Sequence, residues 1–353
     1  MTEWTRKKSM KRIKFHDREK EIKEIKDILG SEPSLITFVY GPINSGKTAL
    51  INNLIGQLPE GYAPFYINLR GRFITGYEDF LNVLFEIDEG GATDNISGYA
   101  TSLLKDLKIV SGIPIPLNLF EQIFEKKDKS KDMFRYIERF FTEISEKRVP
   151  VLVIDELQVI GDMKIDGFLI YKLFNFFVRL TKELHLAHVF VVTSDSLFLE
   201  QVYSEAMLEG RCDHLLVDDF DYETTSVFLG GYGLNDEERE RAWKCCGGKT
   251  VHLVKLVNTK FANGDIAEKL EMMLEEAISR LIFMLARNKE RKDDIVDILS
   301  TFTSVEEVKY SERMDIDIVS FLVKQNILFL DPVKRLIKPQ SRLNLLAIRA
   351  VVT

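Results

Sequence analysis

The stretch that decides the fold is VYGPINSGKTALI, residues 39–51, where a β-branched apolar run meets glycines, a lysine and a threonine. Within it, GPINSGKT fits the spacing G-x-x-x-x-G-K-[ST] between an expected strand, SLITFVY, and an expected helix from about residue 47 to 57. Gly41 and Gly46 allow a tight loop whose backbone N–H groups face inward, and the helix N-terminus adds its positive dipole end. The context predicts a loop that cradles phosphates.

The residue types in this loop assign roles to its members. Lys47 is expected to reach the β- and γ-phosphates of a nucleotide, and the Thr48 hydroxyl is expected to bind Mg²⁺. The alternative is a chance glycine-rich turn, which the flanking strand and helix disfavour. The residues expected to bind the nucleotide are Gly41, Pro42, Ile43, Asn44, Ser45, Gly46, Lys47, Thr48 and Ala49.

Two acids follow a second apolar run, VPVLVIDE, residues 149–156, which is typical of a buried central parallel strand. Asp155 is expected to hold Mg²⁺ through its water shell, and Glu156 to orient the attacking water. Alternatively, one of these acids caps the helix that follows. The pair favours an ATPase that hydrolyses its nucleotide over a small-molecule kinase.

Hydroxyl groups end a third expected strand, HVFVVTSDS, residues 188–196. If this strand lies between the strand before the phosphate loop and the strand that ends at Asp155, Thr193 and Ser194 approach the γ-phosphate. Thr-Ser at a strand end is also common in turns, so that alternative stays open.

Strand signals alternate with helical periodicity up to about residue 220, which predicts an α/β domain with a doubly wound parallel sheet. Residues 221–287 carry only helical periodicity, and we expect them to form a helical lid. From residue 288 the pattern is short helices, with SERMDIDIVSFLVKQN as the last, and then a hairpin over ILFLDPVKRLIKPQ. This is the order of a winged helix. The sequence therefore predicts a phosphate-loop ATPase domain over residues 1–220, the lid, and a winged-helix domain over 288–353.

Composition bounds the class of protein. Hydrophobic residues make up 45% and charged residues 29% of the 353, which is ordinary for a soluble globular protein. No apolar run approaches the roughly 18 residues of a membrane span, and the basic N-terminus lacks the apolar region of a secretory signal. Three cysteines, two of them adjacent, fit a reducing compartment. We expect a cytoplasmic protein without membrane contact.

With these motifs in place, the sequence resembles the archaeal P-loop ATPases of the AAA+/STAND type and, distantly, origin-recognition ATPases. FHDREKEIKEI resembles the family's opening segment, which implies that Phe15, Asp17 and Arg18 lie near the adenine or the phosphate. EGRC resembles a Gly-Arg element after the sensor strand, which points to Arg211. CCGGKTVHL resembles the lid element Gly-Gly-x-Pro-x-x-L, with Thr250 where the family usually has proline.

The resemblance implies a nucleotide-driven switch that uses ATP and ADP with Mg²⁺. We therefore expect an ATPase, with slow hydrolysis, whose lid moves with the γ-phosphate and repositions the winged helix. The alternative is an ATP-regulated DNA-binding protein of origin-recognition type with little intrinsic hydrolysis. The residues expected to act in catalysis are Glu156, Lys47, Arg211, Ser194 and Thr193.

The charge pattern bears on the partner. The net charge is −7, although residues 280–353 hold 13 Lys and Arg against 10 Asp and Glu. Acids in the expected recognition helix would repel a phosphate backbone, whereas the hairpin is basic. We expect a protein partner ahead of duplex DNA, and DNA contact, if any, through the hairpin. The acids are Glu312, Asp315 and Asp317, and the hairpin cations are Lys334, Arg335, Lys338 and Arg342, opposed only by Asp331.

Arg211 bears on self-association. It precedes the strand HLLVDDF, and we expect it on the nucleotide-bearing edge of the sheet. From there a guanidinium stabilises transition-state charge equally well in its own site or in that of a neighbouring chain. The alternative is a surface pair with Asp213 or Asp218.

Overall fold

The computed structural model describes residues 12–90, 95–104, 111–125, 129–160, 169–205, 208–312 and 314–352. Most of the basic stretch RKKSMKRIK, and Arg313 in the expected recognition helix, lie outside the described residues. The chain forms two compact units. The sheet unit comprises Glu19–Gly41 and Lys47–Val217, and the helical unit comprises Met1–Arg18, Pro42–Gly46 and Asp218–Thr353.

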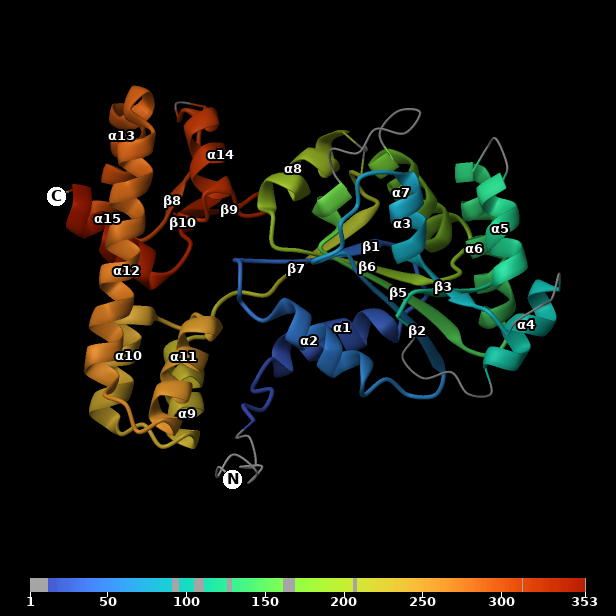
Figure 1. Ribbon diagram of the computed structural model, residues 1–353, viewed down its shortest axis with the longest axis horizontal. Helices are drawn as coiled ribbons and strands as arrows, with labels where there is room; N and C mark the ends of the chain where they lie inside the picture. Colours follow the sequence, from blue (N-terminus) through green and yellow to red (C-terminus); the bar gives the residue numbers. More distant parts are fainter. Residues whose placement is uncertain are drawn as a thin grey trace, which may run out of the picture. The chain divides into compact units, whose positions relative to one another are not determined.

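Five strands of the sheet unit form one sheet in the order β2-β5-β6-β1-β7, and every pairing between neighbours is parallel (Figure 1). Strands β1, β5 and β6 fall within segments expected from the sequence, and β7 begins two residues before the expected strand HLLVDDF. Strand β6 lies between β1 and β5, which is the condition under which Thr193 and Ser194 were expected to approach the γ-phosphate. The strands are β1 (Ile36–Tyr40), β2 (Tyr62–Asn68), β5 (Val149–Asp155), β6 (His188–Thr193) and β7 (Cys212–Leu216).

Helices cover both faces of this sheet, so the doubly wound prediction is confirmed (Figure 1). Helices α1 (Glu19–Leu29) and α2 (Lys47–Ile55) share one apolar core with side chains of all five strands. On the other face, Phe38 of β1 stacks on Phe174 of α7 (Leu169–Val178), and Phe65 of β2 stacks on Phe141 of α6 (Lys129–Ser145). Burial on both faces explains why these strands read as continuous apolar runs.

A second, two-stranded parallel sheet was not anticipated from the sequence. It pairs β3 (Phe85–Asp88) with β4 (Ile113–Pro116). Gly112, at φ +142°, lets the chain pass so closely that a Cβ there would lie 3.1 Å from the Glu86 nitrogen. The remaining elements of the sheet unit are α3 (Tyr77–Leu84), α4 (Ile96–Leu103), α5 (Leu117–Glu125), α8 (Ser196–Glu205), a 3-10 helix (Leu157–Ile160) and a π-helical turn (Arg179–Glu183).

The helical unit begins with four helices, as expected for residues 221–287. The side chains of Asp221, Asn235 and Asp265 cap three of them by accepting backbone N–H groups. One apolar core joins the helices, and Leu343 from the C-terminal end of the chain packs into it. The helices are α9 (Tyr222–Gly231), α10 (Asp236–Cys246), α11 (Thr250–Phe261) and α12 (Ile266–Arg287).

The C-terminal segment contains the expected hairpin within a small antiparallel sheet of order β8-β10-β9. The expectation that the helix before the hairpin is the last one is wrong, because α15 follows and packs along α12. Its buried residues include Leu343 and Ile348. The elements are α13 (Lys292–Ser300), β8 (Val308–Lys309), α14 (Ile316–Lys324), β9 (Leu328–Asp331), β10 (Leu336–Pro339), α15 (Arg342–Val352) and 3-10 helices at Lys289–Arg291 and Thr301–Thr303.

In the part of the chain that the structure describes, no helix combines the length and the apolar character that a bilayer crossing requires.

Candidate functional site

The loop between β1 and α2 needs both of the glycines that the motif supplies. Gly41 has φ +151°, and a Cβ there would lie 2.2 Å from the carbonyl oxygen of Val217. Gly46 has φ +99°, a conformation that L side chains rarely adopt. The glycine spacing therefore reflects a close backbone approach at Gly41 and a left-handed turn at Gly46.

Lys47 is buried, with 6% of its surface exposed. It is the first residue of α2, and its Nζ donates a hydrogen bond to the carbonyl oxygen of Gly41 at 3.0 Å. The ammonium group therefore lies back along its own loop, which is the placement that the motif requires for a lysine that reaches phosphates.

Asp155 ends β5 with 1% of its surface exposed. Its Oδ2 accepts hydrogen bonds from the Thr48 hydroxyl and the Tyr66 hydroxyl, each at 2.8 Å. Its Oδ1 is buried and has no hydrogen-bond partner among the described residues. Burial raises the pKa of Asp155 above its usual value, and the charge of Glu156 raises it further, while the two hydroxyl donors act in the opposite direction. A buried carboxylate oxygen without a donor is costly unless a cation binds it.

The oxygen donors at the end of β5 fit Mg²⁺. The ion prefers carboxylate and hydroxyl oxygens and keeps several waters, so one free carboxylate oxygen beside a threonine hydroxyl suits it. Asp155 and Thr48 are the residues that would hold it. Tyr66 was missed by the sequence interpretation. It could have been found from its position near the end of β2, because β2 pairs in parallel with β5 and the two strands end at the same edge of the sheet. Burial raises the pKa of Tyr66, so its hydroxyl stays a donor.

Glu156 adopts a left-handed backbone conformation, with φ 64°, which is uncommon outside glycine. The Arg70 guanidinium donates to its Oε1, and the Gln158 amide donates to its Oε2. The Ser194 hydroxyl donates to Oε2 at 3.4 Å. The side chain is 9% exposed. Strained conformations of this kind concentrate at functional sites, where the surroundings hold them.

Thr193 belongs to the same network. Its hydroxyl donates to Oε1 of Gln158 at 2.9 Å and accepts the N–H of Asp195 at 3.0 Å. The structure therefore brings both hydroxyl residues at the end of β6 to Glu156, Ser194 directly and Thr193 through Gln158. Arg70 and Gln158 were missed by the sequence interpretation, although both follow strand ends that face the same edge of the sheet.

Arg211 lies at the other edge of the sheet, so its expected position is wrong. It precedes β7, and its carbonyl oxygen accepts the N–H of Ile36, the first residue of β1, at 3.1 Å. The phosphate loop follows the last residue of β1, five residues further along the strand, about 16 Å away. Among the described residues, no ion pair joins Arg211 to Asp213. Since the strands are parallel, a residue before a strand lies at the amino edge.

Arg18 lies in the helical unit and contacts the phosphate loop. It is 5% exposed, and its guanidinium donates to the carbonyl oxygens of Ser45 and Asp218, both at 2.7 Å. It also lies over the Phe220 ring, 4.6 Å from the centroid. The neighbouring Asp17 instead accepts a hydrogen bond from Thr224, and Phe15 is 36% exposed. Arg18 therefore bonds directly to the phosphate loop, as the resemblance implied.

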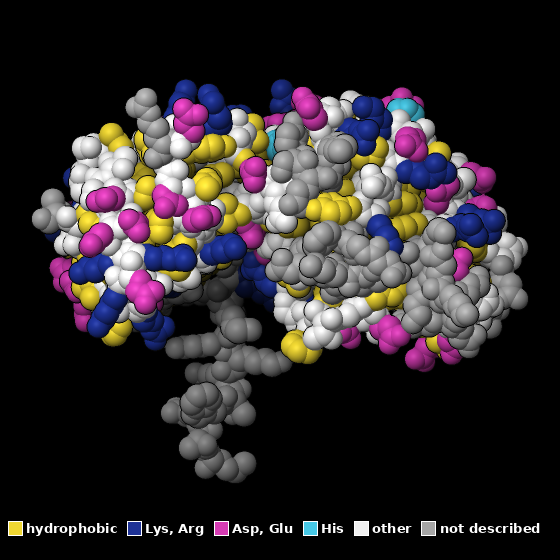
Figure 2. Space-filling view, turned by 90° about the horizontal axis from the view of Figure 1, so that it is seen from above, with side chains coloured by type: hydrophobic (Ala, Val, Ile, Leu, Met, Phe, Trp, Pro, Cys, Tyr) yellow, Lys and Arg dark blue, Asp and Glu magenta, His cyan; other side chains and the backbone are white. Residues whose placement is uncertain are grey.

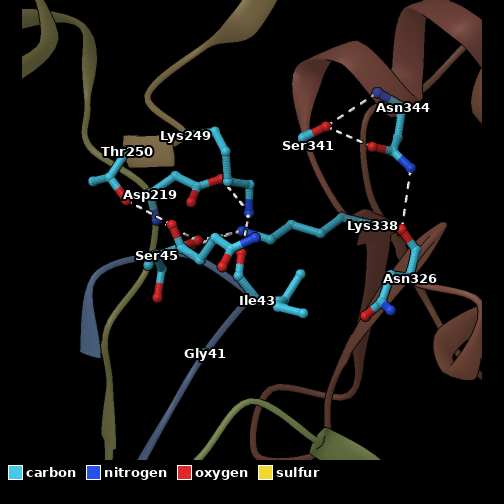
Figure 3. A network of polar contacts seen from close by, with 12 residues as sticks. Gly41, Ile43, Ser45, Asp219, Lys249, Thr250, Asn326, Lys338, Ser341 and Asn344 are labelled. Carbon is cyan, nitrogen blue, oxygen red and sulfur yellow. Dashed lines mark hydrogen bonds and ion pairs between the residues drawn. The ribbon is translucent and has the colours of Figure 1, made fainter. Parts of the chain in front are cut away.

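Lys249 and Thr250 contact the same loop from the start of α11 (Figure 3). The Lys249 Nζ donates to the carbonyl oxygen of Ile43 at 3.2 Å, and the Thr250 hydroxyl donates to that of Asn44 at 2.6 Å. Lys249 is 2% exposed and pairs with Asp219 at 3.1 Å. Burial lowers the pKa of Lys249 and raises that of Asp219.

Two of the four cations expected on the hairpin are paired within the helical unit, and one of them, Arg342, is the first residue of α15. The Lys338 ammonium lies 2.6 Å from a carboxylate oxygen of Asp218 (Figure 3), and Arg342 lies 2.5 Å from Glu306. Burial raises the pKa of Asp218, but Lys338 outweighs it and holds that pKa below its usual value. The basic character of the hairpin is therefore partly neutralised by neighbouring acids.

Comparisons with known proteins agree with this geometry. The family described as an ATPase domain predominantly from Archaea matches residues 15–256, and the C-terminal domain of MJ1010-like ATP-binding proteins, described as uncharacterized, matches residues 267–352. An uncharacterized ATP-binding protein of Pyrococcus abyssi is 46% identical over 339 residues, which is 95% of this chain and 98% of that protein. One of Methanocaldococcus jannaschii is 43% identical over 355 residues, covering 96% of this chain and 98% of that protein.

A solved structure shares the fold. The Walker-type ATPase PABY2304 of Pyrococcus abyssi superposes with a TM-score of 0.62 over 95% of this chain and 96% of that chain, at 18% identity. The phosphate loop after β1, the acid at the end of β5 and the family match over residues 15–256 converge. The chain belongs to the family of ATPase domains found predominantly in Archaea, and it is an ATP-binding member of that family.

Proposed function

We propose that the chain binds Mg²⁺–ATP and hydrolyses it slowly, as a switch whose nucleotide state is passed to its C-terminal domain. The observation that carries the proposal is the Oδ1 of Asp155, which is buried beside the Thr48 hydroxyl and has no hydrogen-bond partner in the described part of the chain. Mg²⁺ bound there would neutralise the charge of the β- and γ-phosphates. The phosphate-binding residues proposed are those of the loop from Gly41 to Ala49, with Lys47 as its cation.

Glu156 is the residue proposed to orient and deprotonate the attacking water. In the structure its two carboxylate oxygens are occupied by Arg70, Gln158 and Ser194. Because Arg70 occupies one of the oxygens that would accept the proton of the attacking water, we expect turnover to be slow until Arg70 moves away. Ser194 and Thr193 are the residues proposed to report the γ-phosphate to this network.

The switch itself is proposed to use residues 221–287 as a lid and residues 288–353 as the domain that responds, with the characteristics of a winged helix. Support comes from the Lys338–Asp218 pair, because it ties the hairpin to the residue that directly follows the end of the sheet unit. A change in the backbone at Asp218 would therefore reach β10 through an ion pair.

A protein is the proposed partner of the C-terminal domain. Lys338 and Arg342 are already paired, and Asp315 caps α14, the expected recognition helix, where its charge opposes a phosphate backbone. On the face shown in Figure 2, Lys and Arg side chains are interspersed with Asp and Glu rather than gathered in one basic area. Self-association stays a proposal that the mass of the protein in ATP and in ADP would test.

The proposal is tested by steady-state ATPase assays with Mg²⁺ or EDTA, together with fluorescent-ADP binding. Glu156→Gln should keep nucleotide binding but lower turnover at least about a hundredfold, the scale of a lost general base. Lys47→Ala should lose binding while keeping its fold. Wild-type turnover in Glu156→Gln, or unchanged affinity in a folded Lys47→Ala, would contradict the proposal. Duplex DNA added at low and moderate salt should leave turnover unchanged; a salt-dependent stimulation would favour a DNA partner instead.

A further inference from the structure

Three consecutive peptide carbonyls of the phosphate loop are each bound by a donor from outside the loop. The donors come from two separate segments of the helical unit, the N-terminal arm and the start of α11, as Figure 3 shows for α11. The three bonds are Lys249 to Ile43 at 3.2 Å, Thr250 to Asn44 at 2.6 Å and Arg18 to Ser45 at 2.7 Å.

Holding a carbonyl also orients the N–H group that follows it. A trans peptide is planar, so its C=O and the next N–H point in opposite directions, and the described chain has no cis peptide bond. The three bonds therefore turn the N–H groups of Asn44, Ser45 and Gly46 away from their donors. Positive φ at Asn44 (60°) and Gly46 (99°) gives the loop the alternating backbone in which successive N–H groups form an anion-binding nest.

The two charged donors are themselves fixed. Lys249 is 2% exposed and is held by Asp219, and Arg18 is 5% exposed and is held by the Asp218 carbonyl oxygen and the Phe220 ring. A buried cation that contacts a backbone carbonyl cannot leave without breaking its ion pair or its packing. A loop ordered in advance binds its ligand with less entropic cost than a loop that must be ordered on binding.

We propose that Arg18, Lys249 and Thr250 are positioning residues that clasp the phosphate loop in its anion-binding shape. The inference rests on the proposed nucleotide function and adds its regulation: because Lys249 and Thr250 begin α11, nucleotide affinity depends on where that helix lies. Proline at this position would have no hydroxyl, so the bond to Asn44 needs a hydroxyl residue such as Thr250.

Substitutions of Thr250 give the cleanest test, because α11 should fold without the hydroxyl. Thr250→Val and Thr250→Pro should weaken fluorescent-ADP binding about 3- to 10-fold, the scale of one neutral hydrogen bond, and Thr250→Ser should restore it. Proline is tolerated at the first helical position. The matched control is Thr259→Val on the same helix, whose hydroxyl donates to the carbonyl of Lys255; its affinity should equal wild type.

Lys249 is tested as a pair with Asp219, because removing the lysine alone leaves an unpaired carboxylate. Lys249→Met/Asp219→Asn should weaken ADP binding about 10- to 100-fold, the scale of a hydrogen bond from a charged group, and Lys249→Arg should recover part of it. Lys260→Met is the control, since it removes another lysine ion pair of α11, the one that joins Lys260 to Glu238 of α10. Its ADP affinity should match wild type.

A second measurement separates the clasp from nucleotide binding as such. In nucleotide-free protein, hydrogen exchange of the peptide spanning residues 41–48 should be faster in the Thr250→Val and Lys249→Met/Asp219→Asn variants than in wild type and the two controls. If wild type fails to bind ADP, the proposed function is wrong, but the exchange rates still test the clasp. If Lys47→Ala loses binding while the Thr250 and Lys249 variants match wild type in both measurements, the clasp is wrong and the proposed function stands.

Discussion

Asp155 and Asp219 are both carboxylates whose pKa is raised by burial, yet their charge is balanced in different ways. Asp219 lies 3.1 Å from the ammonium of Lys249, so the chain supplies its own cation. Asp155 instead receives two neutral hydroxyl donors. Each acid keeps a buried Oδ1 without a hydrogen-bond partner among the described residues, so the difference lies in the ammonium that faces the other oxygen of Asp219. We therefore propose that Asp219 forms a structural ion pair, whereas Asp155 is left to bind a cation from outside the chain.

Removing the charge of Asp155 should have the largest effect. Asp155→Asn keeps the shape of the side chain and an oxygen for the Thr48 hydroxyl, but it removes the charge that would attract Mg²⁺. We expect Mg²⁺-dependent ATP hydrolysis to fall about a thousandfold, the scale at which a single electrostatic contact to the transition state is lost. Steady-state turnover at increasing Mg²⁺ measures this. If turnover stays near wild type at every Mg²⁺ concentration, Asp155 is not the metal residue.

Breaking the ion pair of Asp219 should instead destabilise the fold. Lys249→Met leaves the carboxylate of Asp219 without its cation, and we expect the free energy of unfolding to fall by about 2–3 kcal/mol, less than for a fully buried pair, because the Asp219 side chain is 22% exposed. Urea unfolding without nucleotide measures this. Asp155→Asn is the matched comparison and should not lose stability in the same assay. If Lys249→Met and Asp155→Asn lose equal amounts of unfolding free energy, the proposed difference between Asp219 as a structural residue and Asp155 as a binding residue is wrong.

The same contrast predicts a pH dependence. The folded-state pKa of Asp155 lies above its unfolded value, so the folded state holds the proton more tightly, and its contribution to stability falls as pH rises through the window between the two values. Relative to wild type, Asp155→Asn should therefore become more stable as pH rises above the usual aspartate pKa of about 4. Unfolding without Mg²⁺ across the acid range measures the difference. A constant difference across that range would show that the pKa is not raised.

Features of the fold and the site that depend on neighbouring residues could be predicted from the sequence, whereas contacts between residues far apart in the sequence could not. Loop, strand and acid lie close together in GPINSGKT and VLVIDE, so the parallel sheet and the carboxylate at the end of β5 could be expected. The bond from Lys249 to Ile43 joins residues 206 positions apart, and the bond from Tyr66 to Asp155 joins residues 89 apart. No local pattern encodes such contacts.

The short strands β3 and β4 and the C-terminal helix α15 were also missed, because their formation depends on contacts with distant parts of the chain. The pair β3 and β4 consists of four-residue strands whose pairing depends on a close approach at Gly112, which apolar periodicity does not reveal. Helix α15 follows a hairpin that looked like the end of the domain, and its apolar residues are buried by contact with α12 and with the core around Phe228.

Substitution of Arg211 should have the smallest effect, because this charged residue belongs neither to the proposed metal site at Asp155 nor to the ion pair of Asp219. The Ile36 N–H bonds to its carbonyl at the amino edge of the sheet, so its side chain cannot reach a phosphate that binds after the carboxyl end of β1 in the same chain. We expect Arg211→Ala to change stability by less than about 0.5 kcal/mol, as for most surface substitutions, and turnover of the isolated chain to match wild type. A lower turnover at high protein concentration, restored by mixing with Lys47→Ala chains, would show that Arg211 acts on the nucleotide of a neighbouring chain. A loss that is independent of concentration and is not restored by mixing would instead contradict the position that β7 gives this residue.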